Sequence, residues 1–423
     1  MIKDINRVNP NIIYADLNGA FASIEQQAKP SLRGKPVGVT NRWSKNCCVI
    51  ASSYEAKDMG IDTGTRLKDA MAIYKDFKMI EADPPKYFHV HSLMKNILLD
   101  YSPDVVMRSI DEAVLDLTTV RNTVHKGRSL EDIGREIKQR VHDEIGDAMR
   151  INIGIGPNWF LAKQAAIWHK PDGLDRIDYR NLISYYKERP NLQKLKGIGP
   201  KFEARLNAAG IHTTMEFLEA SSDYLQRHVF KSVIGDDWYK KLRGYEVDDR
   251  PTKKGHVGRQ WVLAEPTNDE AYISSTFHYL ALTAGKKLRY INSDARGILV
   301  FANSTDGDHW YQRQMFRSSF YTDQDIYTHA ILLLNQRPRG MKVQSMGLSC
   351  YEITPARRNQ LSLFDDIKDI QRKEWLTTAV DEINDFWGGF KIFPANSLLG
   401  TQIVGQKIPF GGVDFFEPLL KRA

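Results

Sequence analysis

Three acidic residues carry the clearest chemical signal in the sequence. Asp16 follows a short apolar run, and the neighbouring Asp111 and Glu112 stand between two others. Carboxylates at strand ends can hold two Mg²⁺ ions about 4 Å apart, because Mg²⁺ prefers oxygen ligands. Such a pair suits nucleotidyl transfer, in which one ion activates a hydroxyl and the other holds a triphosphate. Taken alone, either motif could instead be a set of solvated strand-end acids.

The elements around these acids must bring them together. The pattern predicts a strand over 11–15, a helix over 18–27, and two antiparallel strands that meet near Asp111. Neighbouring side chains on a strand point to opposite faces, so Asp111 and Glu112 can serve one metal pair only if the chain turns there. With helices over 86–101 and around 130–141 and a strand from Ile151, the β-α-β-β-α-β order predicts a ferredoxin-like sheet in an α+β protein.

The rest of the chain divides by composition. Short-looped helical patterns end in a stretch rich in Gly, Pro and charge, which reads as a linker. Residues 252–358 then hold 14 Lys and Arg against 9 Asp and Glu, which accounts for +5 of the chain's net charge of +7. A basic stretch of this kind favours an anionic partner, although a solvated basic face is the alternative.

Length and composition set the class of protein. A chain of 423 residues suits two to four domains. It has no apolar run of the roughly 18 residues that a spanning helix needs, and its N-terminus lacks an export signal. Three cysteines, two of them adjacent, build neither a disulfide framework nor a CxxC metal pattern. These features predict a cytoplasmic protein with no membrane partner.

Four motifs resemble those of Y-family DNA polymerases, in the same order and spacing. They are YADLNGAFASIE, SSYEAKDMGI, SIDEAVLDLT and GIGPNWFLAKQAAIWHKPDGL, and the resemblance extends from about residue 10 to beyond 400. The CCVIASSYEAKDMGI segment and the long tail resemble the UmuC-like branch first and the DinB-like branch second. The resemblance implies a ferredoxin-like palm with a small fingers insertion, a helix-hairpin-helix thumb and an α/β little finger. The implied boundaries are palm 1–18 and 80–177, fingers 19–79, thumb 178–242, linker 243–252, little finger 253–358 and tail 359–423.

The resemblance also implies roles for individual residues. Asp16, Asp111 and Glu112 match the catalytic metal ligands for two Mg²⁺ ions, with the Leu17 carbonyl as a further ligand. Phe21 matches the aromatic gate that collides with a ribose 2′-hydroxyl, although a core aromatic is the alternative. The implied nucleotide-binding set is Asn18, Gly19, Ala20, Phe21, Tyr54, Lys57 and Lys170.

Two positions depart from the family pattern. Gly19 and Ala20 stand where many relatives have an aromatic or hydroxyl pair, and Trp159 stands where many have Lys. The first difference could open the floor under the sugar. The second leaves open whether that loop contacts phosphate, since Lys163 lies one helical turn further on.

The resemblance implies two DNA contacts outside the palm. The GIG hairpin of Gly197, Ile198 and Gly199, with Lys201, resembles a thumb loop that binds duplex backbone through N–H groups without reading sequence. Arg259 stands in the stretch that resembles the little finger, and we expect it to bind DNA. As a bare GxG, the hairpin could equally be a capping turn.

The implied partners are primer-template DNA, dNTP and a bacterial sliding clamp. Residues Gln360, Leu361, Leu363 and Phe364 match the clamp-binding pentapeptide, in which apolar anchors fill a pocket. A packing strand is the alternative. An accessory subunit and a place in the SOS response to DNA damage are further expectations of the resemblance.

The function expected from these features is low-fidelity translesion synthesis, because fingers of this size cover little of the base pair. No acidic set typical of a proofreading nuclease is visible in the sequence. A non-catalytic DNA-binding scaffold associated with the clamp is one rival, against which the three acids argue. A nucleotidyl transferase restricted to one template context is another, and it would share those acids.

Overall fold

The computed structural model describes the whole chain except residues 1, 3, 45–46, 251–254, 357–366 and 405–423. The chain divides into two compact units that meet in sequence at residues 251 and 252. The predicted clamp-binding residues at 360–364 lie outside the described residues, as does part of the predicted linker. No helix in the described parts is both long and apolar enough to span a lipid bilayer.

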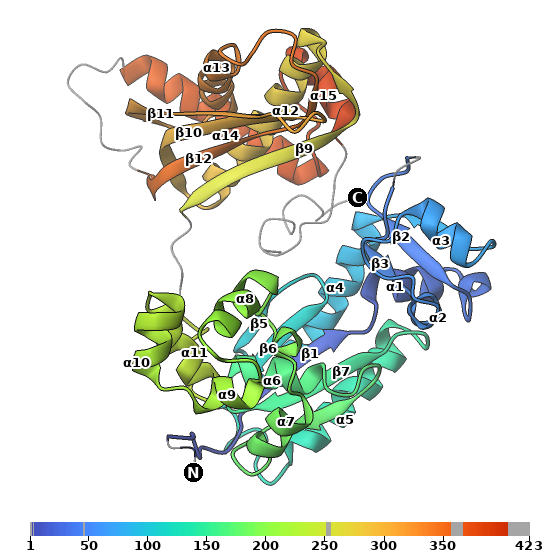
Figure 1. Ribbon diagram of the computed structural model, residues 1–423. Helices are drawn as coiled ribbons and strands as arrows, with labels where there is room; N and C mark the ends of the chain where they lie inside the picture. The colour runs from blue at the N-terminus through green and yellow to red at the C-terminus, as the bar shows by residue number, and fades with distance from the viewer. Residues whose placement is uncertain (1, 3, 45–46, 251–254, 357–366, 405–423) are drawn as a thin grey trace. The chain divides into compact units, whose positions relative to one another are not determined.

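A five-stranded sheet forms the centre of the first unit (Figure 1). The predicted strand, helix, strand pair, helix and strand are all present, so the ferredoxin-like expectation is confirmed. The first four strands pair antiparallel, and the edge strand β8 runs parallel to β7. In sheet order the strands are β5 (Val105–Met107), β6 (Glu112–Asp116), β1 (Ile12–Leu17), β7 (Ile151–Gly156) and β8 (Leu174–Arg176).

Both faces of the central sheet are covered, which explains why β1 is buried along its whole length. Helices α4 (Pro84–Leu99) and α5 (Leu130–Arg140) pack with Ile13, Ala15 and Leu17. Helix α6 (Trp159–Ala166) packs with Ile12 and Tyr14 on the opposite face. This alternation follows the two-residue period of a strand.

Glycine in β7 allows α6 to approach the sheet closely. A Cβ atom added at Gly154 would lie 2.0 Å from the Ala162 carbonyl oxygen, far inside any real contact distance. The glycines of the INIGIG motif therefore let α6 pack closely on the sheet. Helix α6 carries Lys163.

A small module is inserted between β1 and α4. Its sheet has the order β3–β2–β4, with β2 antiparallel to β3 and parallel to β4. One hydrophobic cluster in its described residues consists of Val49, Ala56, Ile61, Ala70 and Phe77, with Leu67, Tyr74 and Met79 packed against it. The expected fingers boundary at residue 79 falls inside β4, so the small sheet runs two residues further. The elements are α1 (Ala20–Ala28), η1 (Pro30–Leu32), β2 (Val37–Thr40), β3 (Ala51–Ser52), α2 (Tyr54–Asp58), α3 (Leu67–Ile73) and β4 (Lys78–Glu81).

Short helices form the end of the first unit, as predicted. They share one apolar core built on Tyr185, Tyr186, Phe217 and Trp238, and α6 contributes Phe160 to it. The elements are α7 (Leu182–Glu188), η3 (Leu192–Lys194), α8 (Pro200–Ala208), α9 (Thr214–Glu219), α10 (Ser222–Tyr224), η4 (Leu225–Phe230) and α11 (Ile234–Leu242), and a further π-helical turn, η2 (Val141–Ile145), follows α5.

The second unit is an antiparallel sheet with its own core, in the order β11–β10–β12–β9. Helices α12 and α13 pack on one face of the sheet. Helix α14, from the expected tail, joins this unit because Asp381 pairs with Arg289 of α12 through two hydrogen bonds. The elements are β9 (His256–Thr267), α12 (Glu270–Tyr290), β10 (Ser293–Ser304), β11 (His309–Phe320), α13 (Asp323–Leu334), β12 (Val343–Pro355), α14 (Ile367–Trp387), η5 (Ala395–Ser397) and α15 (Leu398–Ile403).

Candidate active site

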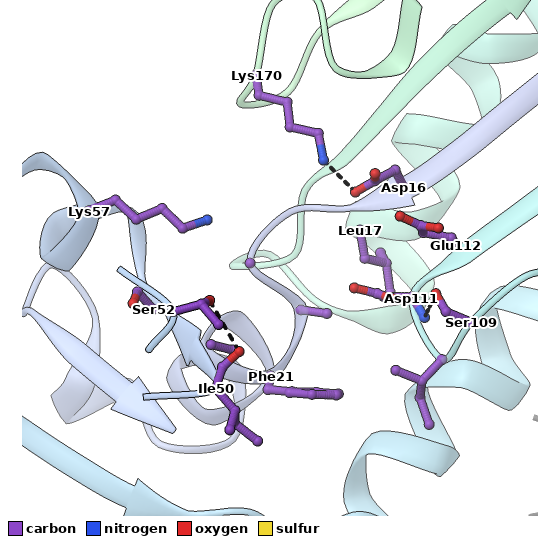
Figure 2. Close-up of a pocket in the computed structure, with 15 residues that line it drawn as sticks. Asp16, Leu17, Phe21, Ile50, Ser52, Lys57, Ser109, Asp111, Glu112 and Lys170 are labelled. Atoms are coloured by element: carbon purple, nitrogen blue, oxygen red, sulfur yellow. Dashed lines mark hydrogen bonds and ion pairs between the residues drawn. The ribbon is translucent and has the colours of Figure 1, made fainter. Parts of the chain in front are cut away.

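A cavity of about 360 Å³ opens where β1 ends, next to the small inserted module. Figure 2 shows carboxylates on one side of it and the Lys57 ammonium on the other, with Lys170 reaching Asp16. Most of the residues predicted to act on metal or nucleotide line this one space. The lining is Asp16, Leu17, Gly19, Ala20, Phe21, Ile50, Ala51, Ser52, Lys57, Thr63, Ser109, Ile110, Asp111, Glu112 and Lys170.

The sheet brings the three acids together. Asp16 on β1 and Glu112 on β6 are direct partners in the antiparallel pairing, so their side chains share a face. Asp111 lies in the turn between β5 and β6, where its carbonyl accepts a hydrogen bond from the Leu17 amide. The turn that Asp111 and Glu112 require is therefore present.

Burial dominates the electrostatics of Asp16 and Asp111. Burial raises the pKa of Asp16 to about 6; Lys170 opposes this, and the charges of Glu112 and Asp111 add to it. The pKa of Asp111 is also raised, first by burial and then by Glu112, while the Ser109 hydroxyl opposes the shift. These mutual effects show that the three carboxylates lie close enough to repel one another.

Glu112 behaves differently because the effects of its partners on its pKa exceed the effect of burial. Burial alone would raise its pKa, but the Lys163 charge and hydrogen bonds from Lys163 and Tyr14 outweigh burial and lower it. The Lys163 ammonium lies 2.6 Å from Glu112 Oε2, and the Tyr14 hydroxyl donates to the same oxygen at 2.7 Å.

The donor chemistry of this site fits a hard divalent cation. Three carboxylates and the Leu17 carbonyl supply oxygen ligands, which Mg²⁺ prefers, and their mutual repulsion would be relieved by a bound cation. In the described residues no three His, Cys, Asp or Glu side chains are already arranged to hold a metal. Asp16 and Glu112 are each bonded to a lysine through one oxygen, which leaves the other carboxylate oxygen of each to serve as a metal ligand.

A basic corner lies opposite the carboxylates. Burial lowers the pKa of Lys57, and the nearby charge of Lys170 lowers it further. The Lys57 ammonium sits 4.5 Å from the centre of the Tyr54 ring. Burial and the Asp16 charge raise the pKa of the Tyr54 phenol to about 12, while a hydrogen bond with Asn18 opposes the shift. Two ammoniums close enough to repel each other favour an anion between them.

Phe21 lines the cavity and is braced from behind. Its ring stacks on Tyr87 with centroids 4.6 Å apart and planes at 16°. The Tyr87 hydroxyl in turn donates to Glu25 at 2.8 Å. The ring is thus both a core aromatic and a wall of the cavity, and the two readings of Phe21 are compatible.

The backbone conformation of the segment before Phe21 requires a glycine at position 19. Gly19 has φ +55, the left-handed region that favours glycine, and Ser52 O would lie 3.3 Å from an added Cβ. Asn18, predicted to bind nucleotide, is buried and does not line the cavity. Its side chain hydrogen-bonds to protein groups instead.

Tyr14 and Lys163 were not predicted as site residues, yet they hold Glu112. Tyr14 lies two residues before Asp16 on a strand, so the two-residue period was a usable signal. Trp159 faces Arg108, with the guanidinium carbon 5.1 Å from the ring centre. The described structure therefore gives Trp159 a cationic protein neighbour.

The predicted DNA contacts are placed differently in the two units. Gly197 has φ +98 and Gly199 caps the start of α8, so the GIG hairpin is a tight loop that enters a helix. Ile198 is buried, whereas Lys201 is exposed. In the second unit, Arg259 lies with its guanidinium carbon 5.8 Å from the centre of the Tyr279 ring of α12. That is the helix-covered face of the sheet, which it shares with buried Val257 and Trp261.

Comparison with known proteins defines the class first. A Dbh–Dpo4–Dbh chimera of Y-family DNA polymerase has the same fold, with a TM-score of 0.68 and 24% identity, and covers 81% of this chain and 98% of its own. An insertion ternary complex of Dbh DNA polymerase has a TM-score of 0.56 and 25% identity over 81% and 98% of the two chains. The fold is therefore that of Y-family polymerases.

Sequence comparison then gives the family. The impB/mucB/samB family matches residues 15–166, and its C-terminal domain matches residues 255–363. DNA polymerase IV of Moorella thermoacetica is 31% identical over 404 residues, covering 93% of this chain and 98% of that protein. DNA polymerase IV of Bacillus anthracis is 27% identical, covering 89% and 91%. This chain belongs to the impB/mucB/samB family and is a DNA-directed DNA polymerase.

The branch within the family is a smaller matter. The similar proteins are named DNA polymerase IV, which is the DinB-like branch that the sequence analysis placed second. The family assignment does not depend on it.

Proposed function

We propose that this polymerase performs low-fidelity, template-directed translesion synthesis and extends a primer by a two-metal mechanism. The observation that carries the proposal is the single cavity in which carboxylates, lysines and an aromatic wall face one another. The carboxylates suit metal ions, the lysines suit phosphate groups, and the aromatic ring can contact the sugar.

The metal ligands in this proposal are Asp16, Asp111, Glu112 and the Leu17 carbonyl. Two Mg²⁺ ions held there would activate the primer hydroxyl and stabilise the charge of the leaving pyrophosphate. The protein holds the carboxylate oxygens close together and largely shielded from water. Tyr14 and Lys163 orient one oxygen of Glu112, and Ser109 donates to Asp111.

The triphosphate contacts in this proposal are Tyr54, Lys57 and Lys170. Lys170 donates to Asp16 at 2.7 Å, so its ammonium lies at the boundary between the acidic and basic sides of the cavity. It can exchange the carboxylate for a phosphate oxygen without leaving the site. Ammonium groups suit this role because they are compact charges with rotatable donors.

Phe21 is the proposed sugar gate. Because its ring is stacked on Tyr87, it could not swing away without losing that contact. A ribose 2′-hydroxyl placed against it would collide, and a deoxyribose would fit.

Low fidelity follows from the size of the inserted module. Its short helices α2 and α3 and its small three-stranded sheet offer little surface with which to test the shape of a base pair, and a damaged template base would meet few contacts. The proposed domains are palm 1–18 and 80–177, fingers 19–79, thumb 178–242, linker 243–252, little finger 253–358 and tail 359–423.

DNA binding in this proposal comes from the GIG hairpin with Lys201 and from the basic second unit. The hairpin offers backbone N–H groups at a helix start. The clamp partner is proposed from Gln360, Leu361, Leu363 and Phe364, and an accessory subunit stays an expectation. The cytoplasm is the proposed location.

Primer extension on undamaged DNA, with each dNTP alone and with the mixture, tests the proposal. Extension that follows the template, with frequent misinsertion when only a wrong dNTP is present, supports it. Addition of one nucleotide whatever the template would support a template-restricted transferase instead. Accurate extension that stops at every wrong base would contradict low fidelity.

A further inference from the structure

Asn18 stands directly behind the cavity, two residues from Asp16. Its side chain is 1% exposed and does not line the cavity. It is nonetheless bonded to the loop that carries Lys170, a proposed triphosphate contact.

Both polar atoms of the Asn18 amide have defined partners. Its Nδ2 donates to Asn152 Oδ1 at 2.7 Å, and its Oδ1 accepts from the Asp172 backbone N–H at 2.9 Å. Asn152 is oriented in turn, because its own Nδ2 donates to the Ala166 carbonyl at 2.7 Å. The amide can therefore face only one way.

These bonds fix the loop that carries Lys170. The loop leaves α6 after Ala166 and enters β8 at Leu174, and Asn152 and Asn18 tie it near its two ends. On its other side, Lys138 donates to the Asp172 side chain at 2.6 Å. Lys170 lies between the tied points and reaches Asp16.

We infer that Asn18 is a positioning residue: it sets Lys170 at a fixed distance from the metal-binding end of β1. The Asn18 backbone is held by the sheet, since its N–H donates to the Arg150 carbonyl. One amide thus links the position of the Asp16 backbone to that of Lys170, the proposed triphosphate contact. The inference rests on the proposed role of Lys170.

The test is steady-state single-nucleotide insertion by Asn18→Ala. Loss of the buried hydrogen bonds should raise the KM for dNTP about tenfold and change kcat much less, because the carboxylates are untouched. Asn384→Ala in the second unit is the matched control, since Asn384 is equally buried and also bonded to backbone groups. It should lower stability and leave the KM for dNTP unchanged.

A double-mutant cycle with Lys170→Ala separates positioning from general support of the fold. If Asn18 acts through Lys170, adding Asn18→Ala to Lys170→Ala should raise the KM far less than it does in the wild type. Full additivity would overturn the inference.

The same double-mutant cycle distinguishes the positioning role of Asn18 from the proposed phosphate role of Lys170. An increased KM in Lys170→Ala with a normal KM in Asn18→Ala would overturn the inference alone. A normal KM in Lys170→Ala would overturn both the phosphate role of Lys170 and this inference. If Asn18→Ala fails to fold, Asn152→Ala removes the acceptor that orients Asn18 and should raise the KM in the same direction; an unchanged KM there would overturn the inference.

Discussion

Replacing Asp16 with asparagine should make the metal-free protein more stable while it removes the activity. The pKa of Asp16 in the folded chain is about 6, against 3.8 for the ordinary side chain, and burial is the main cause. The folded state therefore holds this proton more tightly than the unfolded state does. Stability falls as pH rises from about 4 to 6, and the full cost is present above that window.

The magnitude follows from the size of the shift. About two pKa units at 1.36 kcal/mol each make the charged carboxylate cost about 3 kcal/mol at pH 8 and roughly half of that at pH 5. The effect of the Lys170 ammonium is already contained in that pKa. Neutral Asn avoids this cost, so we expect a net gain of about 3 kcal/mol at pH 8.

Urea unfolding without metal, followed by hydrogen exchange in peptides from β1 and β6, measures this gain. Hydrogen exchange in these peptides reports on the first unit, so unfolding of the second unit does not enter the measurement. Asp132→Asn is the matched control: hydrogen bonds from Ser129 and Arg135 lower the pKa of that exposed carboxylate to about 2, so its replacement should destabilise. Equal or lower stability of Asp16→Asn at pH 8, or a gain that does not shrink at pH 5, would show that the buried Asp16 charge does not destabilise the fold.

Three further predictions follow from the site and its partners. Phe21→Ala should raise ribonucleotide incorporation, because the clash with the 2′-hydroxyl is removed; an unchanged ratio of dNTP to rNTP insertion would count against the gate. Leu363→Ala with Phe364→Ala should abolish clamp binding and clamp-stimulated extension while single-nucleotide insertion without clamp survives, since a tether raises the local primer-end concentration without new DNA contacts. Equal loss of basal insertion would instead make this segment structural. Deleting residues 252–423 should flatten the dependence of log affinity on log salt, as fewer phosphates are neutralised, and an unaltered slope would show that this part binds no DNA.

The fold was predictable where one side-chain period dominates. The apolar run at Ile12 and Ile13 and the helical spacing of Leu130, Ile133 and Ile137 predicted the right elements, because the strand is buried along its length and the helix buries one regular face. The turn at Asp111 could be stated only as a requirement, since the sequence does not show where a strand bends.

The site was less predictable where partners are distant in sequence. Lys163 reaches Glu112 across 51 residues, and no local pattern gives that pairing. Asn18 was assigned to nucleotide on resemblance, yet its side chain points to Asn152 and Asp172. Arg259 could have been placed better, because it lies two residues from Val257 and from Trp261 and so shares their covered face.

The most direct test of the account is primer extension with Mg²⁺ by Asp16→Asn, Asp111→Asn and Glu112→Gln, measured beside primer-template affinity. We predict that all three variants lose primer extension and keep their affinity for primer-template DNA, because the metals are needed for the chemical step and not for DNA binding. Substantial extension by any of these variants would contradict the assignment of the three carboxylates as the metal site.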